Sequence, residues 1–286
     1  MAIPLKVALR ELLRDWRADL SPEWQQVVDG TELAFDDVDE QLTLYSWEPI
    51  FPSRRDFVLP GEPPDSHIFR AFDGLPPDQV RCVVVGQDPY PSIGFSTGRA
   101  FEAGDCRYWS ELEKMFSCSV RSLLQFVYAF RSGDRRYARG TDDWPDVLRA
   151  ICAPDSDFPA ADRLVQGWVE QGVLMLNASL TLSRFSVAGD PHQARGHLPL
   201  WRPLMARLLN YFSNRPSQPV VFLLFGAAAR EAALAGGVAS DADLDTHPAI
   251  VVLPHPAEGD RFLQHSNPFE LCNEKLAARK AQPIDW

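Results

Sequence analysis

The chain has 286 residues, of which 45% are hydrophobic and 23% are charged. These proportions are typical of globular proteins and exclude a wholly disordered chain, a collagen-like chain and a coiled coil, and no uncharged apolar stretch is long enough for a transmembrane helix. The formal net charge of −11 argues against a simple nucleic-acid binder, because phosphate contacts require lysine and arginine, although a binding face needs only local basic residues.

The five cysteines include no Cys-x-x-Cys pair, so a disulfide framework, an iron–sulfur cluster and a structural zinc site are all poorly supported. Charged residues appear at Arg10, Glu11 and Arg14, too early for the apolar core of a secretory signal peptide. We therefore expect a cytoplasmic protein with reduced thiols and without a metal site.

Residues 1–60 are interpreted as an N-terminal helical extension. Their first half has apolar residues at the spacing of an amphipathic helix pair, with Pro22 in the first turn of the second helix. Residues 46–66 are rich in proline and indicate an irregular connector, which is followed by a short helix that ends at Gly74.

Buried strands and helices alternate through the rest of the chain. Four short apolar runs rich in β-branched residues predict strands at residues 81–86, 173–182, 220–226 and 249–254. Helical patterns lie between them, at residues 108–130, 160–171 and 200–214, and directly after the third strand. This alternation predicts one α/β domain over residues 1–286, with a central four-stranded, mainly parallel sheet and helices on both faces. The polar segment 131–159 breaks the alternation and indicates a surface insertion.

Polar side chains follow each predicted strand, at the edge where open α/β sheets bind their ligands. Asp88 and Tyr90 come after the first strand, Asn177 lies near the end of the second, Gly226 ends the third and His255 follows the fourth. Each residue alone is more often a turn residue or a hydrogen-bonded core residue. Their coincidence at one edge of the sheet favours a functional site.

These motifs resemble those of the family 1 uracil-DNA glycosylases. The matching segments, in the order found in that family, are GQDPYP at 86–91, GRAF at 98–101, VLMLN at 173–177, VVFLLFG at 220–226, PHP at 254–256 and PIDW at 283–286. The resemblance covers about Ile68 to Trp286, apart from the segment 131–159.

The resemblance implies a hydrolase of base-excision repair that acts on DNA damage. It would flip uracil out of single- or double-stranded DNA, cut its N-glycosidic bond and leave an abasic site. Asp88, as an ionised carboxylate, would orient the attacking water and stabilise the cationic sugar, and a neutral His255 would donate a hydrogen bond to uracil O2. The family needs no metal or cofactor, and we expect a monomer.

The resemblance also implies how the base is recognised. Asn177 would accept N3–H on its carbonyl and donate N–H to O4, a pattern that cytosine presents in reverse. Tyr90 would stand against C5 and exclude the methyl group of thymine, Phe101 would stack on the flipped ring, and the backbone of Gln87 would help to hold the base.

The chain departs from the family where DNA is gripped. The family usually has Ser-Pro-Leu-Ser after the His-Pro pair, but Ala257 replaces the first serine here. Phe262 and Leu263 are candidates for the missing leucine wedge, and their packing as loop anchors is an equally open interpretation. Glu102 replaces a usual serine, and Gly226 is retained without the serine that normally follows it. Further candidates for DNA contacts are Ser119, Ser122, Arg184, His192, Arg195, His197, Arg230 and Arg261.

Two alternatives remain open at the level of the sequence. The first is a glycosylase for another modified pyrimidine, for instance in phage DNA, against which Tyr90 and Asn177 argue. The second is a relative that binds DNA or a protein without cutting. The acidic charge favours the second alternative, whereas the joint presence of Asp88, Asn177 and His255 disfavours it.

Overall fold

The computed structural model describes residues 2–112, 117–186, 189–216 and 218–286. Its centre is a sheet of four parallel strands in the order β4-β3-β5-β6. The strands are β3 (Cys82–Gly86), β4 (Val173–Asn177), β5 (Val221–Phe225) and β6 (Ile250–Leu253). Each strand lies within a predicted apolar run, so the predicted sheet is confirmed.

The register brings the carboxyl ends of the strands to one edge of the sheet. At that edge Gly86 pairs with Asn177, so the loop after β3 starts beside the last residue of β4. β4 is shorter than the predicted run 173–182, because the chain leaves the sheet after Asn177 and Leu182 pairs with Phe51 of the connector. The chain that follows β4 therefore contacts the connector.

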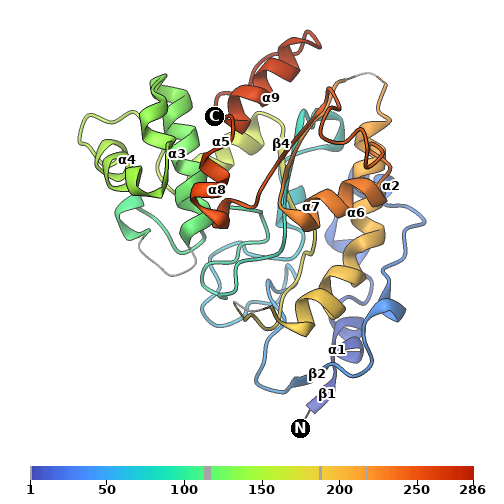
Figure 1. The fold of residues 1–286 in the computed structure, drawn as a ribbon. Helices are drawn as coiled ribbons and strands as arrows, with labels where there is room; N and C mark the ends of the chain where they lie inside the picture. Colours follow the sequence, from blue (N-terminus) through green and yellow to red (C-terminus); the bar gives the residue numbers. More distant parts are fainter. Residues whose placement is uncertain (1, 113–116, 187–188, 217) are drawn as a thin grey trace.

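Helices cover both faces of the sheet, as predicted. The main helices are α3 (Cys118–Ser132), α5 (Leu164–Glu170), α6 (Leu198–Ser213), α7 (Ala227–Ala235) and α9 (Pro268–Ala277). Figure 1 shows α6 and α7 on one side of the sheet and α3, α5 and α9 on the other. No helix in the described part of the chain is both long enough and apolar enough to cross a membrane.

The described residues of the helix predicted over 108–130 include two helical segments. A 3₁₀ turn covers Trp109–Glu111, and α3 begins at Cys118. Residues 113–116 of that prediction lie outside the described residues. α3 ends where Gly133 adopts a φ of +67°, a left-handed conformation that glycine enters without steric cost.

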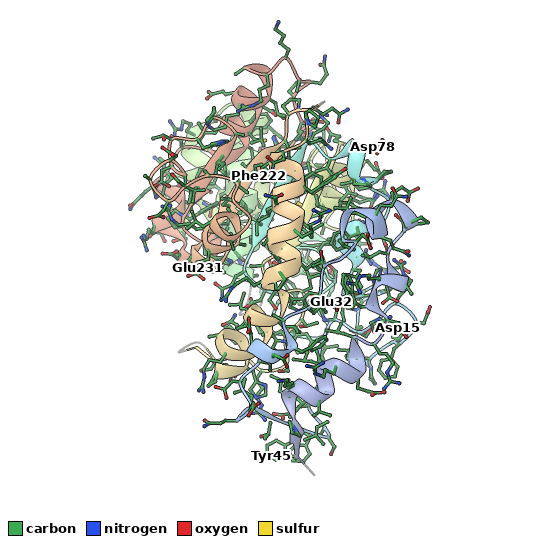
Figure 2. All side chains as sticks on the ribbon, turned by 90° about the vertical axis from the view of Figure 1, so that its right-hand side faces the viewer. Asp15, Glu32, Tyr45, Asp78, Phe222 and Glu231 are labelled. Carbon is green, nitrogen blue, oxygen red and sulfur yellow. The ribbon has the colours of Figure 1, made fainter. Side chains whose placement is uncertain are left out.

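The predicted helix pair at the N-terminus is present as α1 (Leu5–Leu12) and α2 (Pro22–Val27), with Pro22 in the first turn. Two short strands that the sequence did not indicate, β1 (Ala2–Pro4) and β2 (Thr43–Tyr45), pair antiparallel. Figure 2 shows this region, with Asp15 and Glu32 labelled, beside α6. The helix expected to end at Gly74 is only a 3₁₀ turn over Arg70–Phe72.

The segment 131–159 is a small helical lobe against α3, whereas sequence analysis predicted no helix there. Its main element is α4 (Trp144–Ile151), and Trp144, Val147 and Ile151 are buried at the spacing of one helix face. The lobe also holds the short helix α8 (Asp260–Leu263) in place, because the N–H and hydroxyl of Thr141 donate to Asp260 Oδ1 at 2.6 and 2.8 Å. The insertion therefore supports the loop that follows His255.

Candidate active site

The carboxyl ends of the strands open into a cavity of about 530 Å³. Six residues predicted to bind or cut the base line this cavity together: Gln87, Asp88, Tyr90, Phe101, Asn177 and His255. They come from segments up to 168 residues apart in the sequence and meet because β3, β4, β5 and β6 end at the same edge. The cavity therefore combines an acid, an amide, an imidazole and two aromatic rings.

Asp88 is held in the loop that follows β3. Burial raises the pKa of its carboxyl group to about 7, because the ionised form loses solvation and gains only a weak contact from Gln87 Nε2 at 3.5 Å. The sequence-based mechanism requires an ionised carboxylate. With this pKa, about half of the Asp88 side chains in the empty cavity carry a proton at pH 7.

His255 follows β6 and has a defined tautomer. Its Nδ1 accepts a hydrogen bond from the N–H of Ala257 at 3.1 Å, so this nitrogen carries no proton. Burial lowers the pKa of the imidazole to about 4, which keeps the ring neutral at physiological pH. The single ring proton is therefore on Nε2. The N–H of His255 donates to Glu258 Oε1 at 2.9 Å and fixes the turn.

The side chain of Asn177 has room because its partner in the sheet, Gly86, has no side chain. A Cβ atom at Gly86 would lie 2.6 Å from Asn177 Oδ1 and 3.1 Å from the ring of Phe101. Among the described residues, no side chain or backbone group forms a hydrogen bond with the amide of Asn177, although only 4% of this residue is exposed. A buried amide of this kind is suited to a ligand that offers one donor and one acceptor.

Two aromatic rings form fixed walls of the cavity. Phe101 packs edge-on against Phe225, with 5.7 Å between ring centroids, and lies 5.9 Å from the ring of His255. Tyr90 packs edge-on against Phe95 at 4.6 Å, and its hydroxyl lies 3.1 Å from Ser119 Oγ. Because each ring has a partner on another segment, neither can move aside freely.

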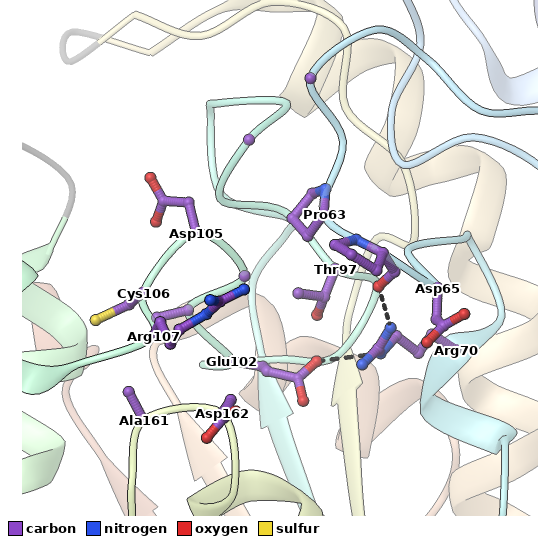
Figure 3. A pocket seen from close by; sticks show the side chains of 15 residues that line it. Pro63, Asp65, Arg70, Thr97, Glu102, Asp105, Cys106, Arg107, Ala161 and Asp162 are labelled. Carbon is purple, nitrogen blue, oxygen red and sulfur yellow. Dashed lines mark hydrogen bonds and ion pairs between the residues drawn. The ribbon is translucent and has the colours of Figure 1, made fainter.

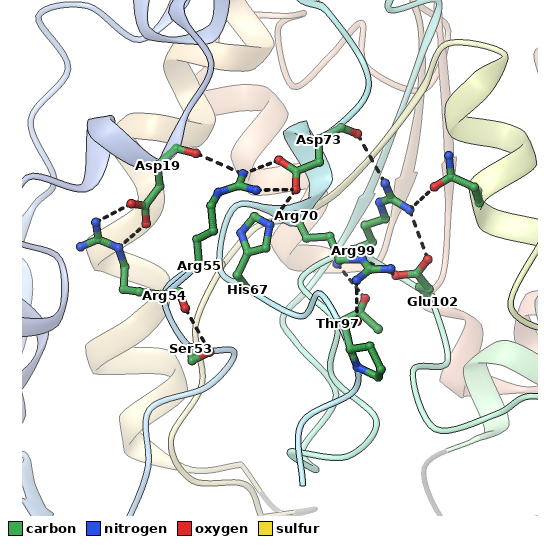
Figure 4. Close-up of polar contacts among 12 residues, drawn as sticks. Asp19, Ser53, Arg54, Arg55, His67, Arg70, Asp73, Thr97, Arg99 and Glu102 are labelled. Atoms are coloured by element: carbon green, nitrogen blue, oxygen red, sulfur yellow. Dashed lines mark hydrogen bonds and ion pairs between the residues drawn. The ribbon is translucent and has the colours of Figure 1, made fainter. Parts of the chain in front are cut away.

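Phe101 has a left-handed backbone with φ +59°, which is rare for a phenylalanine and costs on the order of 1–3 kcal/mol. Buried charges lie on both sides of it. Arg99 Nη1 donates to Glu102 Oε1 at 3.3 Å and to Gln166 Oε1 at 2.9 Å, and Arg70 Nε lies 3.3 Å from Glu102 Oε2. Figure 4 shows these contacts joined to a wider network around Asp73. The ion pairs hold the strained turn that presents the Phe101 ring.

A second cavity of about 570 Å³ lies beyond Glu102. Figure 3 shows Arg70, Glu102 and Arg107 on its wall. Arg70 and Glu102 are paired with each other, and none of the six predicted base-pocket residues lines this space. It is separate from the cavity at the strand ends.

Several predicted DNA contacts are contradicted by burial. Phe262 and Leu263 are 0% and 3% exposed, and Phe262 packs edge-on against Phe126 and Phe225. The wedge hypothesis is wrong for both residues, because residues 260–263 form α8 and its apolar face packs on the core. Ser122 is fully buried within α3 and cannot reach a phosphate, whereas Ser119 lines the cavity.

The remaining candidates are mostly occupied by other contacts. His192 and His197 are buried and hydrogen-bonded to Ser183, so the prediction that they contact DNA is wrong. Gly226 faces His255 and has a φ of +87° that favours glycine. Each predicted arginine pairs with at least one carboxylate, the pairs being Arg184–Glu48, Arg195–Asp39, Arg230–Asp241, Arg230–Asp245 and Arg261–Glu258.

Phe185 is a cavity residue that the sequence motifs did not indicate. This residue lines the cavity and is 43% exposed, in the loop that follows β4. The available signal was an aromatic residue a few positions after the end of a strand, in a segment otherwise rich in small and polar residues.

Known proteins are similar to this chain over most of its length. The model of the Uracil DNA glycosylase superfamily matches residues 72–277. A uracil-DNA glycosylase of Limosilactobacillus reuteri (strain DSM 20016) is 30% identical over 220 residues, 77% of each chain. That of Corynebacterium glutamicum is 29% identical over 266 residues, 90% of this chain and 97% of the relative.

Two solved structures are similar in fold. The crystal structure of wild-type UNG from Nitratifractor salsuginis has a TM-score of 0.58 and 24% identity, and 95% of each chain is covered. Mimivirus UNG Y322L in complex with UGI has a TM-score of 0.60 and 17% identity over 99% of this chain and 94% of that one. With most of its length matched by the family model and by curated relatives, this chain belongs to the uracil-DNA glycosylase superfamily.

Proposed function

We propose that the cavity at the strand ends is the place where this protein excises uracil from DNA, in base-excision repair. One observation carries the assignment: a carboxyl group, a neutral imidazole, an amide and two aromatic rings converge in a single cavity. A base must leave the DNA stack to reach such a cavity.

Asn177 reads the Watson–Crick edge of the flipped base in this proposal. Its amide offers one acceptor and two donor hydrogens that form no hydrogen bond with the described part of the chain, which suits N3–H and O4 of uracil. Tyr90 is fixed by Phe95 and Ser119, so it resists a substituent at C5. Phe101, which is presented by the turn that Glu102 holds, stacks on the ring of the flipped uracil. These features also argue against a glycosylase for bulky modified pyrimidines or cytosine derivatives.

His255 stabilises the leaving base in this proposal, and Asp88 stabilises the sugar. The bond between C1′ and N1 breaks and its electron pair leaves with uracil, whose O2 accepts the Nε2–H of His255. Positive charge grows on the sugar beside Asp88, and this charge favours the ionised carboxylate more in the transition state than in the empty enzyme. Water then bonds to C1′ and gives up a proton to the Asp88 carboxylate, leaving an abasic sugar. That proton finally neutralises the uracil anion.

The test is release of uracil from oligonucleotides that contain one uracil. Asp88→Asn and Asn177→Ala should each lose at least about a hundredfold in rate, the usual effect of removing an electrostatic or binding group from an active site. Asp78→Asn, at an exposed acid before β3, is the matched control and should act like wild type. No release by the wild type from single-stranded or duplex DNA would refute the proposal and favour a binder without catalysis.

We propose further that the protein acts as a monomer, in the cytoplasm, on single- or double-stranded DNA. One chain supplies every residue of the proposed site. All five cysteines are free, including Cys82 and Cys272, whose Sγ atoms lie 3.7 Å apart, which fits a reducing compartment. Gel filtration at micromolar concentration should give the monomer mass, and a dimer peak would contradict this assignment.

A further inference from the structure

We propose that an exposed aromatic column beside the cavity binds unpaired DNA that flanks the target uracil, by stacking on its bases. The aromatic column consists of Trp47, Tyr45 and the guanidinium of Arg184. The proposal rests on the proposed function, which places DNA at the carboxyl edge of the sheet, and it adds a second binding surface for the strand outside the cavity.

The column is layered and open to solvent. The rings of Tyr45 and Trp47 are stacked with centroids 4.6 Å apart and an angle of 6° between their planes. Arg184 Cζ lies 5.6 Å from the centroid of Tyr45, within the range of cation–π contacts. Tyr45 is 42% exposed and Trp47 is 72% exposed. A tryptophan of this exposure leaves a large apolar surface in water, which a further flat ring would cover.

Hydrogen bonds hold the column in place before any base binds to it. Glu48 accepts from Nε and Nη2 of Arg184, both at 2.6 Å, and from the N–H of Tyr45 at 2.7 Å. Arg184 Nη2 also donates to the carbonyl of Thr43 at 3.0 Å. Because the guanidinium and the backbone around Tyr45 are already held, little conformational freedom is lost when a base stacks on the column.

The column and the base cavity are connected through the loop that follows β4. Arg184 directly precedes Phe185, which is itself 43% exposed and lines the cavity. The antiparallel bridge between Leu182 and Phe51 ties the same loop to the connector that begins after Tyr45. In Figure 2, Tyr45 lies at the bottom of the molecule, whereas Asp78, which comes just before β3, lies in the upper half, so Tyr45 is on the side to which the strands point.

An unpaired strand is the occupant that fits these features. Stacking on aromatic rings is tolerant of sequence, because every base has a flat face, and it is unavailable to bases inside a duplex. The formal net charge is −11, and Arg184, Arg195, Arg230 and Arg261 are paired with carboxylates, so charge alone binds phosphates weakly. Stacking supplies affinity that does not depend on that charge.

The first test measures binding without catalysis. Fluorescence anisotropy would follow a labelled, uracil-free single strand of mixed sequence and a blunt duplex of the same sequence. Trp47→Ala should weaken single-strand binding by about tenfold, the scale of one lost base–aromatic stack, and leave duplex binding unchanged. Trp47→Phe should restore most of the affinity. Tyr108→Ala is the matched control, because Tyr108 is an exposed aromatic residue (62%) that does not line the base cavity.

The second test measures excision from a long single strand and from a short one that is limited to the uracil and its immediate neighbours. Trp47→Ala should raise KM on the long strand by about tenfold, with kcat unchanged, and leave the short strand unaffected. Equal effects on single-strand and duplex binding, or no effect on either, would overturn the proposal. A dimer of the wild type that Trp47→Ala dissociates would instead assign the column to a protein contact. Failure of the wild type to release uracil would refute the proposed function, while the anisotropy still tests the column.

Discussion

Replacing Asp88 with asparagine is expected to abolish excision and, at the same time, to stabilise the fold at alkaline pH. The pKa of Asp88 is about 7 in the folded protein against an ordinary value of 3.8. At about 1.36 kcal/mol per pH unit, this difference corresponds to about 4 kcal/mol, and water in the open cavity reduces it to about 2 to 4 kcal/mol. Asparagine has nearly the same shape and no charge to desolvate, so the variant avoids this cost.

The sign of the pH dependence follows from the same shift. Between pH 3.8 and about 7 the folded state holds a proton on Asp88 that the unfolded chain has lost, so the stability of the wild type relative to Asp88→Asn falls as pH rises through this range. The advantage of the variant is therefore near zero at pH 4 and full at pH 8.

Thermal unfolding followed by circular dichroism measures this advantage. At about 2 °C per kcal/mol for a domain of this size, Asp88→Asn should melt about 4 to 8 °C above the wild type at pH 8, with the two curves converging at pH 4. Asp78→Asn, which removes an exposed acid, should show no such gain. An Asp88→Asn variant that melts at or below the wild type at pH 8 would refute the argument that burial destabilises the ionised Asp88.

Three further predictions concern the reaction and its support. Steady-state kinetics on uracil DNA should show kcat/KM falling about tenfold from pH 8 to pH 6, because the ionised fraction of Asp88 falls from about nine tenths to about one tenth; a rate that is flat over this range would contradict its pKa of about 7. Glu102→Gln should lower the free energy of unfolding by about 3 kcal/mol, because Arg70 and Arg99 would lose their buried charged partner. The same variant should raise KM, because the ring of Phe101 would be displaced. An unchanged KM in the folded variant would show that the ion pairs do not position the ring. Phe262→Ala should destabilise by about 3 to 5 kcal/mol in a urea titration but keep kcat within about twofold at low temperature, as expected for a core residue; a large loss of kcat with unchanged stability would restore the wedge hypothesis.

The strands and the base pocket could be predicted from the sequence because both depend on local patterns. Buried parallel strands must be continuously apolar, so the runs that became β3 and β5 stood out against the polar segments around them. Polar residues placed directly after such runs are brought together by the sheet itself. Asp88, Asn177 and His255 could therefore be expected to meet before any contact between them was known.

Only the tertiary structure decided the state and surroundings of these residues. The pKa of Asp88 depends on how much water reaches its carboxyl group in the cavity, and the direction in which Phe262 points depends on whether α8 packs on the core. The column of Tyr45, Trp47 and Arg184 joins residues almost 140 positions apart through contacts that no local pattern records. Burial and long-range pairing are properties of the whole packed chain. The local sequence therefore identifies the chemical groups of the site, whereas the fold sets the protonation and the exposure of those groups.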